Sequence, residues 1–391
     1  MALDLGKIRD NIDGIDKQLV ELFEKRMELC REVAEYKIET GKKVLDTERE
    51  KAKIEKISQL VKDSDNVHAI DDLFLQIMAN SRKMQYRLLE KTSGTLREPY
   101  EAIDEVCKTG CKVVYQGVPG AYAHIATKKY FGEGVDCYNT STWRDAMEDV
   151  KTGKADYAVL PIENSKAGIV ADVYDLLREY NNYIIAETYV KIEHALLGLP
   201  GTDLDKVKVV YSHPQGLMQC DEFLNKHKNW QQVGQSNTAV SAKKIIEEKD
   251  ATHVAIASEE AAKIYGLEVL QSCINTSDNN TTRFVIVTKT RKFVRNAQKM
   301  SIVFETDNET GTLYNLLSHI IYNGLNMNKI ESRPIEERNM EGRKWEFRFF
   351  VDFEGNIDDP RVMNALRGIE EEANSIKLLG NYNIITIYEQ I

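Results

Sequence analysis

Polar side chains interrupt the apolar stripes of three helices that the sequence predicts within residues 1–92. The interrupting residues are Arg26 and Lys37 in the first helix, Glu50 in the second, and Ser81 and Gln85 in the third. At 100° per residue, Lys37 returns to within about 20° of the face that carries Arg26. All five side chains are therefore predicted to point into one shared apolar interior.

One polar group on such a face can be an ordinary core residue with its own hydrogen-bond partner. Five of them, several charged, are hard to explain in that way, because an unpaired buried charge is costly. A ligand with two negative charges would satisfy them. The pattern predicts a ligand-binding site between the helices.

Arg9 does not share this face, because it precedes Arg26 by seventeen residues and so lies about 100° away around the helix. The first helix is also predicted to be about 35 residues or roughly 50 Å long, too long for a monomeric bundle of this size. A dimer that exchanges the helix would bring Arg9 into the partner's site.

Thr47 and Glu50 form a capping-box pattern that predicts the start of the second helix.

A linker helix is expected at residues 93–110, and an α/β pattern follows at residues 111–290. Its polar motifs stand at the ends of predicted strands, where open α/β sheets bind ligands. They are Gln116–Gly120, Pro161–Ser165, Ser212–Gln215 and Asn280–Phe284. Each alone could be a turn. The glycine loop precedes a helix, so its backbone amides could bind a carboxylate.

Residues 299–391 read as strand, helix, strand, strand, helix, strand, which is the ferredoxin-like βαββαβ order. The predicted fold is therefore multidomain, with an all-α module, an α/β domain and an α+β domain in series.

The bulk properties exclude several classes of protein. The 391 residues carry a net charge of −10, which argues against binding nucleic acid or an anionic membrane. Apolar runs are too short for a membrane span, and the N-terminus has no signal-peptide core. Six scattered cysteines are typical of a reduced, cytoplasmic protein. We find no metal motif and no G-x-G-x-x-G, so no metal or organic cofactor is expected.

Residues 5–90 resemble the all-helical class of chorismate mutase, an intertwined dimer of three-helix chains. The ligand residues of that family match Arg9, Arg26, Lys37, Asp46, Arg49, Glu50, Ser81 and Gln85. The resemblance implies a pericyclic rearrangement of chorismate to prephenate, which needs positioning and charge stabilisation but no base. It also implies that Lys37 and Gln85 face the ether oxygen, while Glu50 and Asp46 address the ring hydroxyl.

The α/β region resembles prephenate dehydratase, whose two lobes, like those of periplasmic binding proteins, flank the active site. The matching residues are Glu163, Asn164, Ser212, His213, Gln219, Thr282 and Arg283. Ala121 and Ala123 stand where many relatives carry hydroxyl residues. The resemblance implies that Thr282 protonates or hydrogen-bonds the leaving hydroxyl of prephenate.

Two roles in the dehydratase remain open at this point. Arg283 suits a substrate carboxylate, and the alternative is a salt bridge on a strand. A threonine hydroxyl is a poor acid, so either Glu163 or His213 could be the ultimate proton source.

Residues 301–391 resemble the ACT-type regulatory domain of the same enzymes. Its effector motifs match Gly311, Thr312 and Leu313, and Glu331, Ser332, Arg333 and Pro334. The family usually has alanine where Thr312 stands, which bears on the size of the pocket. The resemblance implies a phenylalanine site at the interface between two such domains.

Together the three regions predict a bifunctional enzyme of phenylalanine synthesis that acts on chorismate and prephenate and is inhibited by phenylalanine. A homodimer or a higher homo-oligomer is expected. The alternative is a small-molecule sensor with the same folds and no turnover.

Overall fold

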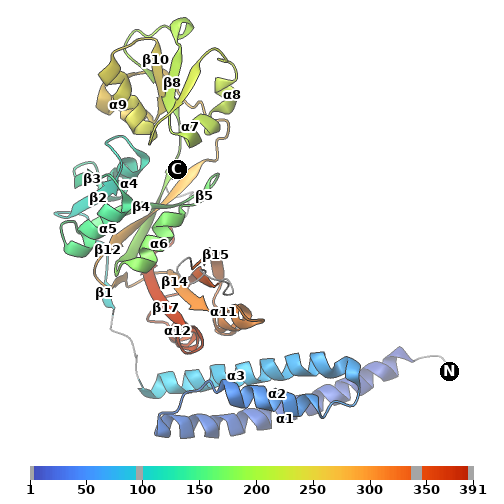
Figure 1. The fold of residues 1–391 in the computed structure, drawn as a ribbon. Coiled ribbons are helices and arrows are strands. Elements are labelled where there is room, and N and C mark those ends of the chain that lie inside the picture. Colours follow the sequence, from blue (N-terminus) through green and yellow to red (C-terminus); the bar gives the residue numbers. More distant parts are fainter. Residues whose placement is uncertain (1–3, 94–99, 336–345, 386–391) are drawn as a thin grey trace. The chain divides into compact units, whose positions relative to one another are not determined.

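The computed structural model describes residues 4–93, 100–335 and 346–385. The chain divides into two compact units (Figure 1). The first unit contains residues 1–99 and 303–376, and the second contains residues 100–302 and 377–391. Strands β14 (Lys299–Thr306) and β17 (Ser375–Tyr382) contribute residues to both.

The first unit begins with three helices. They are α1 (Leu5–Thr40), α2 (Thr47–Ser58) and α3 (Val67–Ser93), with the short 3₁₀ helix η1 (Ser64–Asn66) before α3. Helix α1 has 36 residues, close to the predicted length, and ends at Gly41 in the left-handed conformation. The predicted Thr47 cap is wrong. Asp46 is the N-cap of α2, because its carboxylate accepts a hydrogen bond from the Arg49 amide.

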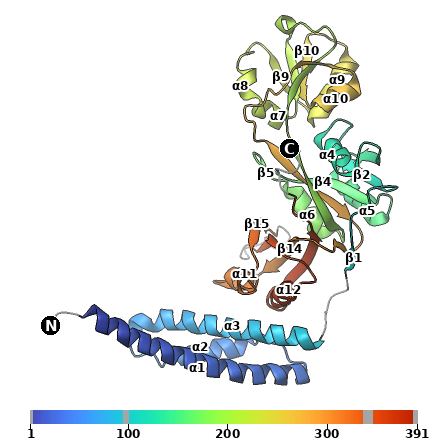
Figure 2. The same ribbon diagram turned by 180° about the vertical axis from the view of Figure 1, so that it is seen from behind.

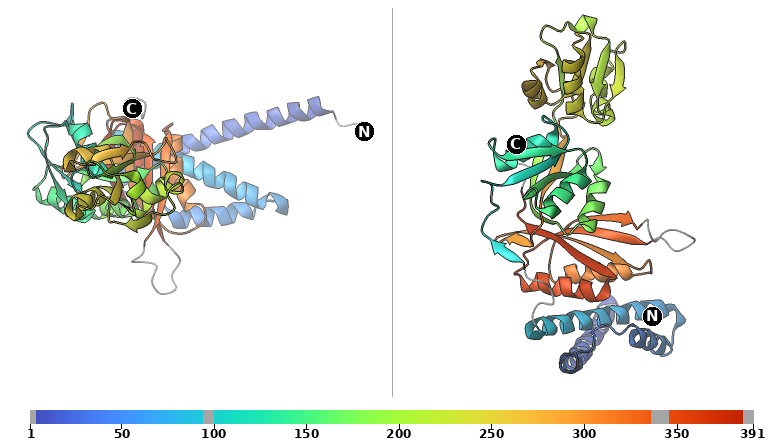
Figure 3. Two further views of the ribbon diagram at one scale, coloured as in Figure 1. Left: turned by 90° about the horizontal axis from the view of Figure 1, so that it is seen from above. Right: turned by 60° about the vertical axis from the view of Figure 1, so that its left-hand side comes forward.

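The apolar stripe of α1 is largely uncovered within the chain. Leu5, Ile12, Ile15, Leu19 and Leu22 are each at least half exposed. Figure 3 shows the N-terminal part of α1 extending beyond α2 and α3.

The remaining elements of the first unit follow the predicted βαββαβ order. After β14 come α11 (Thr312–Tyr322), β15 (Met327–Pro334), β16 (Phe347–Glu354) and α12 (Pro360–Glu372), and then β17. Their strands are ordered β15-β16-β14-β17. Helices α11 and α12 pack on each other and on α3.

The second unit has two lobes (Figure 2). The first lobe contains β2 (Lys112–Gln116), α4 (Tyr122–Phe131), β3 (Asp136–Thr140), α5 (Trp143–Thr152), β4 (Tyr157–Asn164), β5 (Gly168–Ile169), α6 (Ala171–Glu179), β6 (Tyr183–Lys191) and β12 (Thr281–Thr288). Its sheet has the order β6-β12-β4-β2-β3, in which β12 is antiparallel to both neighbours.

The second lobe lies between β6 and β12 in the sequence, so the chain crosses between the lobes twice. Its strands are β7 (Ala195–Gly198), β8 (Val209–Ser212), β9 (Gln231–Gly234), β10 (His253–Ala257) and β11 (Glu268–Gln271), in the order β11-β7-β10-β8-β9. Its helices are η2 (Leu204–Lys206), α7 (Pro214–Gln219), α8 (Asp221–Leu224), α9 (Thr238–Glu248) and α10 (Glu259–Tyr265).

The predicted linker helix at residues 93–110 is wrong for its described part. Residues Glu101–Ile103 form strand β1, which pairs in parallel with β13 (Lys292–Val294). Strand pairing supplies the backbone hydrogen bonds that a helix would otherwise make internally.

Candidate active sites

A cavity of about 300 Å³ lies between the three N-terminal helices. The cavity brings together seven of the eight residues matched to the mutase pattern: Arg26, Lys37, Asp46, Arg49, Glu50, Ser81 and Gln85. The eighth, Arg9, is exposed on α1 and is not among the residues that line it.

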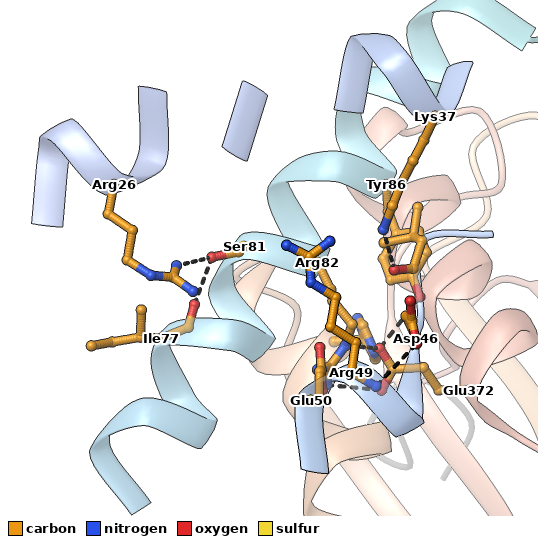
Figure 4. A network of polar contacts seen from close by, with 12 residues as sticks. Arg26, Lys37, Asp46, Arg49, Glu50, Ile77, Ser81, Arg82, Tyr86 and Glu372 are labelled. Carbon is orange, nitrogen blue, oxygen red and sulfur yellow. Dashed lines mark hydrogen bonds and ion pairs between the residues drawn. The ribbon is translucent and has the colours of Figure 1, made fainter. Parts of the chain in front are cut away.

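Hydrogen bonds fix several of these side chains (Figure 4). The Arg26 guanidinium donates to the Ser81 hydroxyl at 2.6 Å, and that hydroxyl lies 2.8 Å from the Ile77 carbonyl. Lys37 Nζ donates to the Val44 carbonyl at 2.6 Å. Arg26 and Lys37 are therefore held at the wall of the cavity by contacts within the chain.

The charges of the cavity favour an anion. Its cations are Arg26, Lys37, Arg49, Lys53 and Arg82, and its carboxylates are Asp46 and Glu50, which leaves an excess of three positive charges. Burial lowers the pKa of Lys37, opposed by the carboxylate of Asp46. Gln85 Oε1 is buried and accepts no hydrogen bond from the residues that the structure describes. A ligand would give this amide the partner that it lacks.

Two charged lining residues, Lys53 and Arg82, are absent from the sequence-based set. Arg82 is 7% exposed and binds both oxygens of Glu50, at 2.8 and 2.6 Å. The signal that could have found Arg82 is its position beside Ser81, one residue further along α3.

A second cavity, of about 700 Å³, is lined by residues of both lobes of the second unit. Four of the predicted dehydratase residues line it: Asn164, His213, Gln219 and Thr282. Asn164 ends β4, His213 and Gln219 belong to α7 and its N-cap, and Thr282 lies on β12. The cavity therefore brings together motifs that are more than 100 residues apart in the chain.

Asn164 and Thr282 are directly opposite each other on the antiparallel strands β4 and β12. Asn164 Nδ2 donates to Thr282 Oγ1 and to Asn280 Oδ1, both at 2.8 Å. Asn164 Oδ1 in turn accepts the amides of Lys166 and Ala167. Because Thr282 accepts from Asn164, its own hydroxyl proton is available to donate to a ligand.

His194 lines the same cavity and was not predicted. Its Nε2 lies 2.9 Å from Gln219 Oε1, and its Nδ1 lies 3.1 Å from the Tyr122 hydroxyl. Burial lowers the pKa of His194, opposed by its hydrogen bond to Gln219. A single histidine before an apolar strand has the pattern of an ordinary core residue, so the sequence alone did not identify His194 as a site residue.

The other three predicted dehydratase residues are not among those that line the cavity. Ser212 is buried and donates to the Ile256 carbonyl at 2.8 Å. Arg283 Nε binds the buried carboxylate of Glu187 at 2.8 Å, and Arg283 NH1 lies 3.9 Å from Glu163. Adjacent residues of a strand face opposite sides, so Thr282 and Arg283 diverge.

None of the described residues that line this cavity is arginine or lysine. The first residues of α4 and α9 border it instead. The N-cap of α4, Ala121, makes no side-chain cap hydrogen bond, so first-turn amides of α4 are left for another acceptor. Helix N-termini of this kind attract carboxylates.

The structure places the predicted effector residues on two elements. Gly311 is the N-cap of α11 with a φ of 84°, and Thr312 and Leu313 begin that helix. Glu331, Ser332, Arg333 and Pro334 form the end of β15.

Among the described residues, we find no helix apolar enough to cross a membrane and no metal-binding cluster of histidine, cysteine or acidic side chains.

Comparisons with known proteins match both regions of the chain that contain these cavities. Residues 8–86 match the model of chorismate mutase type II, and residues 113–292 match that of prephenate dehydratase. The bifunctional chorismate mutase/prephenate dehydratase of Enterobacter agglomerans is 32% identical over 96% of this chain and 95% of its own. The Escherichia coli K12 enzyme of the same name is 32% identical, with the same coverage.

Among solved structures, a prephenate dehydratase from Arthrobacter aurescens in complex with L-Phe matches with a TM-score of 0.64. It is 28% identical and covers 70% of this chain and 90% of that one. The chain therefore belongs to the family of bifunctional chorismate mutase/prephenate dehydratases.

Proposed function

We propose that this chain converts chorismate to prephenate at the helical site and prephenate to phenylpyruvate at the two-lobed site. The observation that supports this most strongly is the helical cavity, which gathers seven residues of the mutase pattern around an excess of positive charge. Chorismate and prephenate both carry two carboxylates, so each suits such an environment.

For the rearrangement, Arg26 and Arg49 would bind the carboxylates and hold chorismate in its compact conformer. Lys37 and Gln85 would face the ether oxygen, on which negative charge grows as its bond to carbon breaks. Glu50 and Asp46 would address the ring hydroxyl. Asp46 also caps α2, so its second oxygen is the one left for substrate.

For the dehydration, one proton joins the leaving hydroxyl to form water. The electron pair of the bond to the ring carboxylate moves into the ring as carbon dioxide departs. Thr282 would donate a hydrogen bond to that hydroxyl, with its oxygen polarised by Asn164. We assign the carboxylates to the amides at the N-termini of α4 and α9, because Arg283 is held by Glu187. Of the two candidates for the ultimate proton source, His213 lines the cavity and Glu163 does not.

We further propose that a second copy of the chain covers the exposed stripe of α1 and supplies Arg9 to the helical site. The support is the exposure of Leu5, Ile12 and Leu22, at 60%, 50% and 63%. Burying this stripe against another chain would remove it from water.

The C-terminal βαββαβ module would be an ACT-type domain that binds phenylalanine and inhibits the enzyme. Its support is the element order, the Gly311 turn and the L-Phe held by the Arthrobacter dehydratase.

A cytoplasmic location fits the unpaired state of all six cysteines.

The test is to incubate the purified full chain with chorismate and follow prephenate and phenylpyruvate over time. We expect transient prephenate and accumulating phenylpyruvate. A protein that binds chorismate and prephenate but turns over neither would be a sensor, and the proposal would be wrong.

A further inference from the structure

Arg82 links the helical site to helix α12 of the C-terminal module (Figure 4). On one side, Arg82 NH1 binds Glu50 at 2.8 and 2.6 Å. On the other, Arg82 Nε donates to Glu372 Oε1 at 2.8 Å, and NH2 lies 3.4 Å from Glu372 Oε2. The side chains of Arg82 and Glu372 are 8% and 7% exposed. One buried guanidinium therefore holds a carboxylate of the helical cavity and a carboxylate that lies 290 residues away in the chain.

Each carboxylate depends on this guanidinium. Arginine stays charged even when buried, and a buried charge left without a partner is strongly destabilising. Glu372 is the last residue of α12, where the helix dipole disfavours an acidic side chain. Burial alone would raise the pKa of Glu372, but its contact with His319 and the charge of Arg82 outweigh burial and hold that pKa at about 2. Glu372 is thus an anion kept in place by specific partners.

Besides Arg82, two neighbours set the position of Glu372. His319 Nε2, on α11, lies 3.2 Å from Glu372 Oε1, and the Tyr86 hydroxyl on α3 donates to the same oxygen at 3.4 Å. Gly368 lets the two helices approach, because a Cβ there would collide with the His319 ring. A shift of α11 against α12 would therefore move Glu372, and with it Arg82.

We propose that Arg82 is a positioning residue for the rearrangement of chorismate: Glu372 fixes Arg82, and Arg82 holds Glu50 toward the ring hydroxyl of the substrate. This rests on the proposed mutase function of the helical site. Arg82 need not touch the substrate, because it acts through Glu50. The rearrangement site thereby extends beyond the three helices to a residue of the βαββαβ module.

The mechanism follows from the sharing of one cation by two anions, of which Glu372 anchors Arg82 on the side away from Glu50. With Glu372 present, the fork of the guanidinium is shared, and Glu50 is bound through NH1 alone. Without the charge on Glu372, Arg82 is free to move with Glu50, and the carboxylate loses its fixed direction. Loss of alignment in a reaction that depends on positioning lowers kcat more than it lowers binding.

The decisive variant is Glu372→Gln in the full chain, which keeps the shape and removes the charge. We expect kcat for chorismate to fall about 10- to 100-fold with a smaller change in KM. Prephenate supplied directly should be dehydrated at the wild-type rate. Glu370→Gln, an exposed acidic position on the same helix, is the matched control and should behave as wild type.

A second pair of variants tests the role of Arg82 itself. Arg82→Lys keeps the charge without the fork, so it should retain more mutase activity than Arg82→Ala and less than wild type. In the double variant Arg82→Lys/Glu372→Gln, the losses should be less than multiplicative, because both changes disturb one link.

Two outcomes separate the explanations. If Glu372→Gln lowers the melting temperature but leaves kcat for chorismate within twofold of wild type, the ion pair is only structural and the inference is overturned. If wild-type protein does not convert chorismate at all, the proposed function fails first, whatever the variants do. Intact dehydration of prephenate shows that the second unit of each variant is folded, and the helical circular dichroism signal of each variant checks the fold of the first unit.

Discussion

The amide of Asn164 donates a 2.8 Å hydrogen bond to the hydroxyl of Thr282 across two paired strands of one sheet. This bond leaves the Thr282 proton free for substrate. Thr282→Ala should therefore lower kcat for prephenate by roughly 100-fold or more, while chorismate is still consumed and prephenate accumulates. Thr282→Ser should retain more activity because it keeps the hydroxyl. Equal dehydration rates for wild type and Thr282→Ala would remove Thr282 from the mechanism.

Arg26→Ala and Lys37→Ala should each abolish most of the mutase activity. Both cations line the helical cavity, and losing one contact to the developing charge costs about 3 kcal/mol, or roughly 150-fold in rate. Dehydration of added prephenate should be unaffected, because neither residue belongs to the two-lobed unit. Near wild-type conversion of chorismate by either variant would contradict the assignment.

Mixed subunits test whether the helical site is shared between chains. Arg9→Ala and Lys37→Ala should each be inactive as mutases, and mixing them should restore part of the activity, because some sites then receive both intact residues. Subunit exchange must be verified independently, for example by energy transfer between labelled chains. Verified exchange without recovered activity would count against a site that includes the partner's Arg9.

The pKa of Glu372 predicts how stability depends on pH. Its folded value of about 2 lies below the ordinary 4.5, so its stabilising contribution is present above pH 4.5 and is lost as pH falls toward 2. The titratable side chains that face it are Arg82, Lys83, His319 and Tyr86.

We expect the difference in unfolding free energy between wild type and Glu372→Gln to shrink by about 1 kcal/mol from pH 6 to pH 4. Urea unfolding of the first unit, followed at both pH values, measures this difference. A difference that does not change with pH would mean that Glu372 titrates normally in the folded protein.

Phenylalanine should inhibit dehydration with a sigmoidal dependence, and Glu331→Ala should weaken that inhibition without lowering the basal rate. A phenylalanine pocket formed by two C-terminal modules can bind its ligand only when the two modules are docked on each other. Phenylalanine would therefore favour the docked arrangement of the subunits. A coupling free energy of 1–3 kcal/mol between the two sites would weaken substrate binding roughly 5- to 150-fold when phenylalanine is bound. Unchanged inhibition in Glu331→Ala, and also in Arg333→Ala, would argue that the effector binds elsewhere.

Truncation near Arg295 is a poorer test of the same idea. Lys299 Nζ binds Glu187 at 2.7 Å, and the Tyr382 hydroxyl accepts from Arg283 at 2.9 Å. Both partners would be lost with the C-terminal residues, so the buried pair of Glu187 and Arg283 would lose one contact on each side. A loss of activity after truncation would then reflect the core of the second unit and not its regulation.

Five of the residues that line the helical cavity could be predicted from helix periodicity, which fixes the residues that share a face, while Asp46 and Arg49 came from the family resemblance. Arg26, Lys37 and Ser81 interrupt apolar stripes, and the structure brings their side chains to one cavity. Arg82 could not be found in this way. Its partner Glu372 lies 290 residues further along the chain. Helix periodicity relates only residues that are a few turns apart, so it cannot predict this contact.

Arg283 illustrates a different limit. A charged residue at the start of a strand looks the same in sequence whether its partner is a substrate or a buried carboxylate. The structure supplies Glu187 as that partner, 96 residues earlier in the chain. The prediction of a linker helix was wrong for a related reason. Residues 101–103 form a strand because β13 pairs with them, and their own sequence does not require a strand.

The forked guanidinium of Arg82 also bears on how such enzymes can be recombined. A helical module cut from this chain would keep Arg82 and Glu50 but lose Glu372, and a βαββαβ module grafted onto a different enzyme would carry Glu372 without its cation. Arg82 would then have Glu50 as its one remaining carboxylate of the two, and Glu372 would keep His319 but lose its guanidinium partner. Fusions and chimaeras built from this sequence should therefore exchange residues 82 and 372 as one unit.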